Sequence, residues 1–89
     1  MKKMVVKLEV YTSQTCPFCP RAVAAAEKVV EKFGDQVEYE HLDVAENMDK
    51  VQQYEIMSVP TVIIDGEVAF VGAPTARNLA EKVKEKLGQ

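Results

Sequence analysis

The first segment of the chain alternates between apolar and other residues. Within residues 4–11, Lys7, Glu9 and Tyr11 separate apolar side chains that recur at every second position. The apolar positions are Met4, Val6, Leu8 and Val10. This period of two predicts a β-strand with one buried face.

A helix is predicted after this strand, because the apolar positions begin to recur every three to four residues. The apolar stripe consists of Cys19, Val23, Ala26, Val30 and Phe33. Gly34 is expected to end the helix, because glycine readily adopts the left-handed conformation found at many helix C-termini.

The middle of the chain predicts a strand followed by a short helix. Residues 36–44 favour the strand, although their alternation is weaker than that of the first strand. Residues 46–56 favour the helix, with Met48, Val51 and Ile56 facing inward.

The C-terminal segment predicts a hairpin and a final helix. Residues 58–64 are rich in β-branched side chains, and Asp65-Gly66 is a strong signal for a two-residue turn into a strand over 67–71. Thr75 is a suitable N-cap for the helix that follows. The inner stripe of that helix is Ala76, Leu79, Ala80, Val83 and Leu87.

The order of predicted elements is βαβαββα, which indicates an α/β fold. Strands joined through a helix pair in parallel with a right-handed crossover, and the hairpin adds an antiparallel strand. We therefore expect residues 1–89 to form a single domain, in which helices flank a four-stranded mixed sheet.

Composition and charge narrow the classes of function. The 89 residues carry 14 acidic and 11 basic side chains, a net charge of −3, so we expect no binding of nucleic acid. The opening MKKMVVKLEV has an apolar stretch that is too short for the core of a signal peptide. No run of apolar residues in the chain approaches membrane-spanning length. These features favour a cytoplasmic monomer without membrane contact.

The only two cysteines lie in the segment TCPFCP, residues 15–20. Proline disfavours helical geometry in the residue before it and suits the first helical position, so Cys16 is the predicted N-cap, followed by Pro17. The positive end of the helix dipole then favours a thiolate at Cys16. Cys19 falls on the apolar stripe and should be the more buried thiol. Position alone thus suggests that Cys16 attacks a target disulfide and that Cys19 resolves the resulting mixed disulfide.

A metal site is the main alternative for this cysteine pair. Zinc commonly takes four protein ligands, and one chain offers Cys16, Cys19 and a distant His41. Only a dimer could supply four thiolates for zinc or an iron–sulfur cluster. A single CxxC motif beside a βαβ pattern favours redox chemistry, so we expect neither a metal nor another cofactor.

Three motifs together resemble the thioredoxin superfamily, over about Val5 to Leu87. They are CPFC after the first strand, VPT at residues 59–61 and VGA at residues 71–73. The resemblance implies a thioredoxin fold in which Pro60 follows a cis peptide bond and packs beside the two sulfurs. It also implies that the backbone of Val59 pairs with an extended segment of the substrate.

The motifs are similar to those of two branches of this superfamily. CPFC looks like the CPYC of glutaredoxins, whereas VGA is similar to the substrate groove of thioredoxins. The combination most resembles the small archaeal-type thioredoxins, which implies disulfide-containing target proteins and a thioredoxin-reductase-like flavoprotein as partners. A glutathione-dependent glutaredoxin remains the alternative.

The resemblance also assigns roles to residues around the cysteines. Targets are expected to contact Pro17 and Phe18 between the cysteines, and to lie against Gly72 and Ala73. Phe18 should be exposed, because its helical position points away from the apolar stripe.

One departure from the family concerns proton transfer. Thioredoxins place a buried aspartate six residues before the first cysteine, and this chain has Val10 there. A gap-free count from Pro60 places His41 where thioredoxins carry the lysine that partners this aspartate. His41 is then either a solvated strand residue or a group that assists Cys19.

Overall fold

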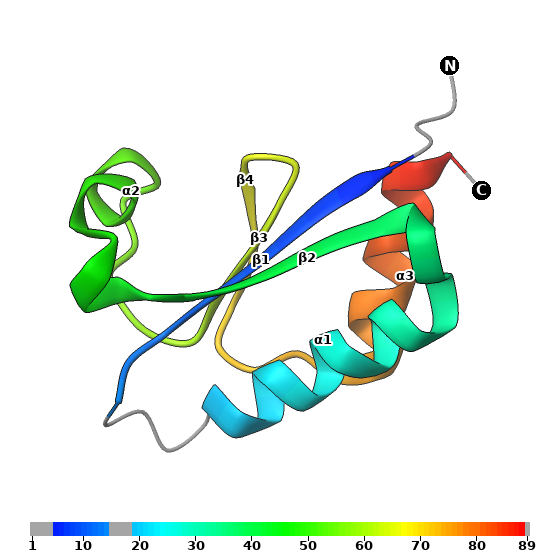
Figure 1. The fold of residues 1–89 in the computed structure, drawn as a ribbon, viewed down its shortest axis with the longest axis horizontal. Helices are drawn as coiled ribbons and strands as arrows, with labels where there is room; N and C mark the ends of the chain where they lie inside the picture. The colour runs from blue at the N-terminus through cyan, green and yellow to red at the C-terminus, as the bar shows by residue number, and fades with distance from the viewer. Residues whose placement is uncertain (1–4, 15–18, 89) are drawn as a thin grey trace.

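The computed structural model describes residues 5–14 and 19–88 and shows the predicted order of elements (Figure 1). The strands and α-helices are β1 (Val6–Thr12), α1 (Cys19–Phe33), β2 (Val37–Asp43), α2 (Met48–Gln53), β3 (Thr61–Ile64), β4 (Glu67–Val71) and α3 (Ala76–Leu87). Short 3-10 turns, Gly34–Gln36 and Val44–Glu46, precede β2 and α2.

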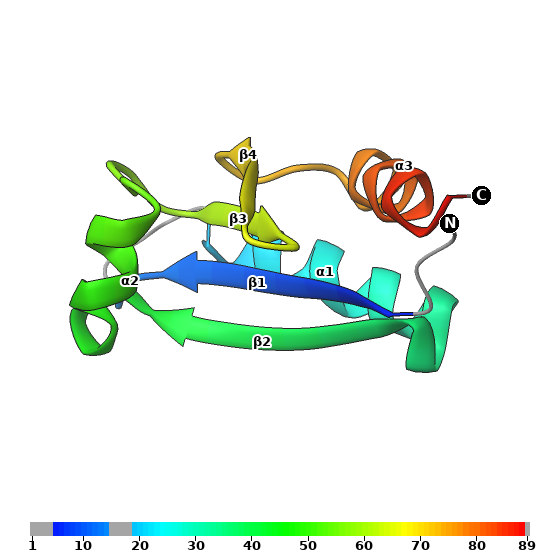
Figure 2. The same ribbon diagram turned by 90° about the horizontal axis from the view of Figure 1, so that it is seen from above.

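The four strands form one mixed sheet in the order β2-β1-β3-β4. β1 pairs in parallel with β2 and antiparallel with β3, and β4 pairs antiparallel with β3. Helices α1 and α3 lie side by side on one face, and α2 lies at the end of the sheet toward which β1 runs (Figures 1 and 2). This is the thioredoxin fold that the sequence motifs imply.

The main core lies between the sheet and the pair α1 and α3. The strands contribute Val6, Leu8 and Val10, which are completely buried. A smaller cluster on the opposite face joins Tyr11, Leu42 and Ile63 and is covered in part by Tyr54 and Ile56. Both faces of the sheet are therefore packed.

The prediction that β1 has only one buried face is wrong. Glu9 is 3% exposed and Tyr11 is 0% exposed, although both alternate with the predicted core residues. The reason is topological: β1 is a central strand between β2 and β3, and its second face lies beneath the segment that contains Tyr54.

Two of the predicted helix faces also need correction. The buried residues of α1 are Ala22, Ala25, Ala26 and Val29. Val23, Val30 and Phe33 are only partly buried, because α1 packs against both the sheet and α3 and its inner face is rotated accordingly. Met48 is 54% exposed, since the six-residue α2 is held to the sheet by the residues that follow it.

Local signals at the turns are confirmed. Asp65 and Gly66 both have positive φ, 52° and 80°, as a two-residue hairpin of this kind requires. The N–H of Asn78 donates to the Thr75 hydroxyl at 3.1 Å, so Thr75 caps α3 as predicted.

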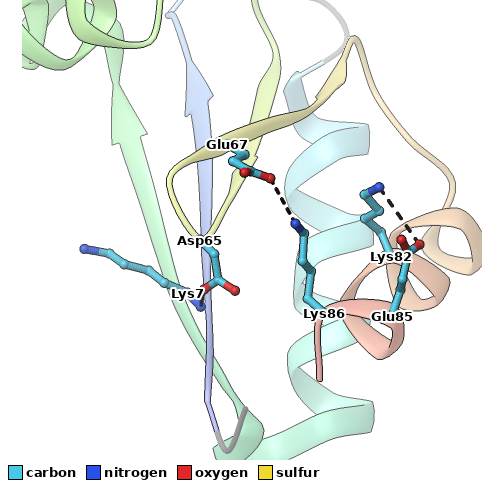
Figure 3. Close-up of polar contacts among 6 residues, drawn as sticks. All are labelled: Lys7, Asp65, Glu67, Lys82, Glu85 and Lys86. Atoms are coloured by element: carbon cyan, nitrogen blue, oxygen red, sulfur yellow. Dashed lines mark hydrogen bonds and ion pairs between the residues drawn. The ribbon is translucent and has the colours of Figure 1, made fainter. Parts of the chain in front are cut away.

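Polar contacts fasten the β3–β4 hairpin to its neighbours (Figure 3). The Lys86 ammonium of α3 donates to the Glu67 carboxylate of β4 at 2.9 Å. The backbone N–H of Lys7 donates to Asp65 Oδ1 at 3.0 Å. The contact with Lys86 lowers the pKa of Glu67, and the same contact raises the pKa of Lys86.

Candidate active site

The cysteine segment lies between the C-terminal end of β1 and the beginning of α1. Thr12 ends β1, and Cys19 is the first residue of α1 in the structure. Cys16, Pro17 and Phe18 lie outside the described residues. The N-cap position of Cys16, the burial of Cys19 and the exposure of Phe18 therefore remain predictions.

The peptide bond between Val59 and Pro60 is cis, as the resemblance implies. Pro60 is buried and Val59 is half-buried. Thr61, the next residue, is paired with Tyr11 across the β1–β3 ladder. Pro60 consequently lies at the end of the sheet where β1 leads into the cysteine segment.

Gly72 is held directly against Pro60. Its N–H donates to the Pro60 carbonyl at 2.8 Å, which joins two segments that are distant in sequence. Gly72 has a φ of +103°, a conformation that side chains with a Cβ rarely adopt. The backbone geometry at this point therefore favours glycine, as the VGA motif provides.

The segment after Gly72 reaches the first turns of α1. Ala73 lines a hollow of about 290 Å³ together with Arg21 and Ala24. The structure thus brings Val59, Pro60, Gly72 and Ala73 to the end of the fold that carries the cysteine segment.

Exposed apolar side chains surround this end of β3. Met57 is 96% exposed and Val71 is 70% exposed, and both line a hollow of about 220 Å³ with Thr61 and Val68. Such a cluster is typical of a contact surface for another polypeptide. The sequence pattern did not predict a role for Met57, and it indicated Val71 only as part of the VGA motif. Apolar residues carry no local signal for exposure, so only the topology identifies them.

His41 lies beside the beginning of α1. It stands opposite Val10 in the β1–β2 register, in agreement with the gap-free count, and it is exposed. A hydrogen bond of 2.7 Å joins its Nε2 to the hydroxyl of Thr12. Both residues line a hollow of about 480 Å³ that also includes Pro20 of α1. Exposure agrees with a solvated strand histidine, and a role in proton transfer remains a prediction.

A buried acid and phenol lie on the other face of β1. The Tyr11 hydroxyl donates to the Glu9 carboxylate at 3.0 Å, and Lys50 of α2 approaches the same oxygen at 4.0 Å. Burial and this hydrogen bond raise the pKa of Tyr11 well above its ordinary value. Burial and the charge of Glu27 also raise the pKa of Tyr39. The sequence pattern did not predict the buried pair of Glu9 and Tyr11.

These tyrosines predict a loss of stability in alkali. The folded state holds the proton of each tyrosine more tightly than the unfolded chain does. The contribution of this difference to the free energy of unfolding is therefore fully present below about pH 10. Above that pH, the free energy of unfolding should fall by up to about 1.4 kcal/mol per pH unit for each such tyrosine. Urea unfolding between about pH 9 and pH 12 measures this slope.

The variant Tyr11→Phe should make the alkaline decline shallower, because the group that titrates is then absent. Equal slopes for Tyr11→Phe and the unmodified protein would contradict the prediction.

The described residues contain neither a membrane-spanning helix nor a metal-type cluster. Across 5–14 and 19–88, no helix combines the length and apolar character needed to cross a membrane. Within the same ranges, no three side chains of His, Cys, Asp or Glu are grouped so that they could hold a metal ion.

A cis-proline hydrogen-bonded to a glycine, at the end of the sheet where β1 leads toward the CxxC sequence, is typical of the thioredoxin class of thiol–disulfide oxidoreductases. The sequence model described as "Thioredoxin domain" matches residues 6–84. The chain therefore belongs to the thioredoxin family.

Individual relatives agree with this assignment. The chain is 46% identical to a thioredoxin of Methanocaldococcus jannaschii over 82 residues, which cover 92% of this chain and 96% of that protein. It is 40% identical to a probable thioredoxin of Methanothermobacter marburgensis over 84 residues, which cover 94% of this chain and 99% of that protein. The chain is thus of the small archaeal type.

Solved structures share the fold. A protein disulfide oxidoreductase from Aeropyrum pernix superimposes with a TM-score of 0.82 at 32% identity, covering 97% of this chain and 39% of that one. A chloroplastic thioredoxin z superimposes with a TM-score of 0.83 at 20% identity, covering 98% of this chain and 82% of that one.

Proposed function

We propose that this protein reduces disulfide bonds of other proteins through Cys16 and Cys19. The observation that carries the proposal is the pairing of cis-Pro60 with Gly72 at the end of the sheet where β1 leads into the cysteine segment. Membership of the thioredoxin family supports thiol–disulfide exchange in general. The choice of protein disulfides as substrates is part of the proposal.

The reaction takes place in two exchanges. The Cys16 thiolate attacks one sulfur of the target disulfide, forms a mixed disulfide and releases the other target sulfur as a thiolate, which takes up a proton. Cys19 then gives up its proton and attacks the Cys16 sulfur as a thiolate, and the second target sulfur leaves as a thiolate that takes up a proton. Two electrons have passed to the target, and Cys16 and Cys19 are left as a disulfide.

The target segment is proposed to lie in extended form against Val59 and Pro60. Backbone pairing at Val59 would hold it in register, and Met57 and Val71 would bury apolar side chains beside the scissile disulfide. A flavoprotein similar to thioredoxin reductase is the proposed source of electrons for the next cycle. Cytoplasmic location and a monomeric state belong to the same proposal.

Insulin reduction distinguishes the proposed function from its glutathione-dependent alternative. Rapid turnover is expected with dithiothreitol as the electron source, and little is expected with glutathione plus glutathione reductase. Turnover with glutathione would make the protein a glutaredoxin in function. Activity with neither donor would contradict both and favour the metal or cluster alternative.

The exposed apolar residues give a specific prediction about substrate binding. Replacing Met57 or Val71 by serine should raise the KM for insulin roughly three- to tenfold with little change in kcat, because about 1 kcal/mol of apolar burial is lost. Val5→Ser is the matched control, since Val5 is also exposed but precedes β1, at the opposite end of the sheet. Equal KM values for all three variants would show that Met57 and Val71 do not contribute to substrate binding.

A further inference from the structure

Helices α1 and α3 lie side by side on one face of the sheet (Figures 1 and 2). Two open hollows lie along the pair of helices and together form a groove. It consists of a hollow of about 430 Å³ and the hollow of about 290 Å³ that reaches Ala73. Lys28 and Ala76 line both hollows, so the two are adjacent. Small residues of both helices, Ala24, Ala25 and Ala80 among them, leave room between the helices. We call this feature the α1–α3 groove.

Positive charge is concentrated along the groove. Its lining includes five cations, Arg21, Lys28, Lys32, Arg77 and Lys84, and a single carboxylate, Glu81. Arg77 already pairs with Glu81 at 3.5 Å. The whole chain has 11 basic residues and a net charge of −3, so nearly half of its basic side chains line one groove of an acidic protein. The charged side chains that line the groove are therefore mainly of opposite sign to the net charge of the chain.

Four of the five groove cations have no carboxylate partner among the described residues, although the Lys32 ammonium lies over the Phe33 ring, 5.8 Å from its centroid. Within 5–14 and 19–88, no carboxylate lies within ion-pair distance of Arg21, Lys28, Lys32 or Lys84. By contrast, two other lysines of α3 do have carboxylate partners, on the side of α3 toward the hairpin (Figure 3). Lys82 pairs with Glu85, and Lys86 pairs with Glu67.

The cations form a row and do not converge on one point. Arg21, Lys28 and Lys32 lie on one side of α1 at intervals of seven and four residues. The eleven residues from Arg21 to Lys32 correspond to about 16 Å along the helix. A single phosphate group cannot reach all of these cations, whereas a polypeptide with repeated carboxylates can.

We propose that the α1–α3 groove binds an acidic polypeptide segment of the proteins that exchange disulfides with this chain. The inference rests on the proposed function and names the class of substrate that the site prefers. One end of the groove is formed by Ala73 and by Arg21, two residues after Cys19. An acidic segment in the groove would therefore hold the attached disulfide next to the cysteine segment.

Binding can be tested without any redox chemistry. A glutamate-rich peptide without cysteine, titrated into ¹⁵N-labelled protein, should produce saturable amide shifts for residues that line the groove, such as Val29 and Ala80. The same peptide with glutamine in place of glutamate should produce none, and added salt should weaken the binding. Shifts confined to another face would overturn the proposal. So would groove shifts that depend on protein concentration alone, because a second copy would then occupy the groove.

A pair of double variants distinguishes the effect of the groove cations on binding from the effect of the net charge. Lys28→Gln/Lys84→Gln removes one cation from each wall and should weaken binding of the glutamate-rich peptide about fivefold. Lys7→Gln/Lys82→Gln makes the same change in net charge outside the groove and should leave binding unchanged. Equal losses for the two double variants would attribute the effect to net charge and overturn the proposal.

A kinetic comparison distinguishes failure of this inference from failure of the proposed function. A glutamate-rich peptide disulfide should be reduced with a kcat/KM about fivefold higher than its glutamine counterpart, a preference that Lys28→Gln/Lys84→Gln should abolish. Equal reduction of both peptides by the unmodified protein would overturn the inference alone. If neither were reduced, the proposed function would fail, and the titration would still decide whether the groove binds acidic peptides.

Discussion

Replacing Cys16 by serine is expected to abolish insulin reduction, leaving only the rate of dithiothreitol itself. A serine hydroxyl is not ionised at neutral pH and cannot displace a sulfur from a disulfide as a thiolate does. Replacing Cys19 by serine should give a different result. The first exchange still occurs, but no second thiolate is present to release the target. The mixed disulfide with Cys16 therefore accumulates, and non-reducing electrophoresis with mass spectrometry detects it.

The controls for this prediction concern folding and metal content. Both serine variants should retain the far-ultraviolet circular dichroism of the reduced unmodified protein, because each substitution replaces a single sulfur atom by oxygen. Full activity of Cys16→Ser would show that the assigned roles are wrong. Loss of bound zinc or of a visible chromophore on substitution would favour the metal alternative for the pair.

Much of the architecture follows from local patterns in the sequence. The order of elements, the hairpin at Asp65-Gly66 and the cap at Thr75 all depend on residues that are close in the chain, and the structure confirms them. The cis bond before Pro60 is also confirmed, although it was implied by the resemblance and not by the residues themselves.

The features that the sequence did not predict depend on which elements come together. The second buried face of β1 exists because β1 is central in the sheet and is covered on both sides. The exposure of Met57 and Val71 depends on where the sheet ends, and hydrophobicity alone would have placed both inside. The α1–α3 groove likewise requires two helices that are separated by more than forty residues in the chain. No periodic pattern within one element contains this information.

Glu9 and Tyr11 connect the second face of β1 to the candidate site. They lie in the same strand that leads into the cysteine segment, and Thr61, which follows Pro60, is paired with Tyr11. A contact that fixes Tyr11 therefore also supports the first residue of β3, which directly follows the cis-proline. The stability of this buried pair consequently matters for the geometry of the site.

Replacing Tyr11 by phenylalanine is expected to reduce the free energy of unfolding by about 1.5 to 3 kcal/mol at neutral pH, as measured by urea denaturation. The ring still fills the same space, so packing changes little. The Glu9 carboxylate, which is 3% exposed, loses the hydroxyl that donates to it at 3.0 Å. A buried charged group left without its hydrogen bond is more costly than the bond is favourable. Tyr54→Phe is the matched control, because Tyr54 packs edge-on against Tyr11 at 6.2 Å between ring centroids.

The double variant Glu9→Leu/Tyr11→Phe separates a lost hydrogen bond from lost packing. Removing both polar groups leaves no unsatisfied charge, so the double variant should be more stable than Tyr11→Phe alone, with a coupling energy of at least about 1 kcal/mol. Lys50 does not prevent this recovery, because its side chain is 35% exposed and can turn its ammonium group to water. Additive losses from the two substitutions would mean that packing, and not the hydrogen bond between Glu9 and Tyr11, stabilises this face of β1.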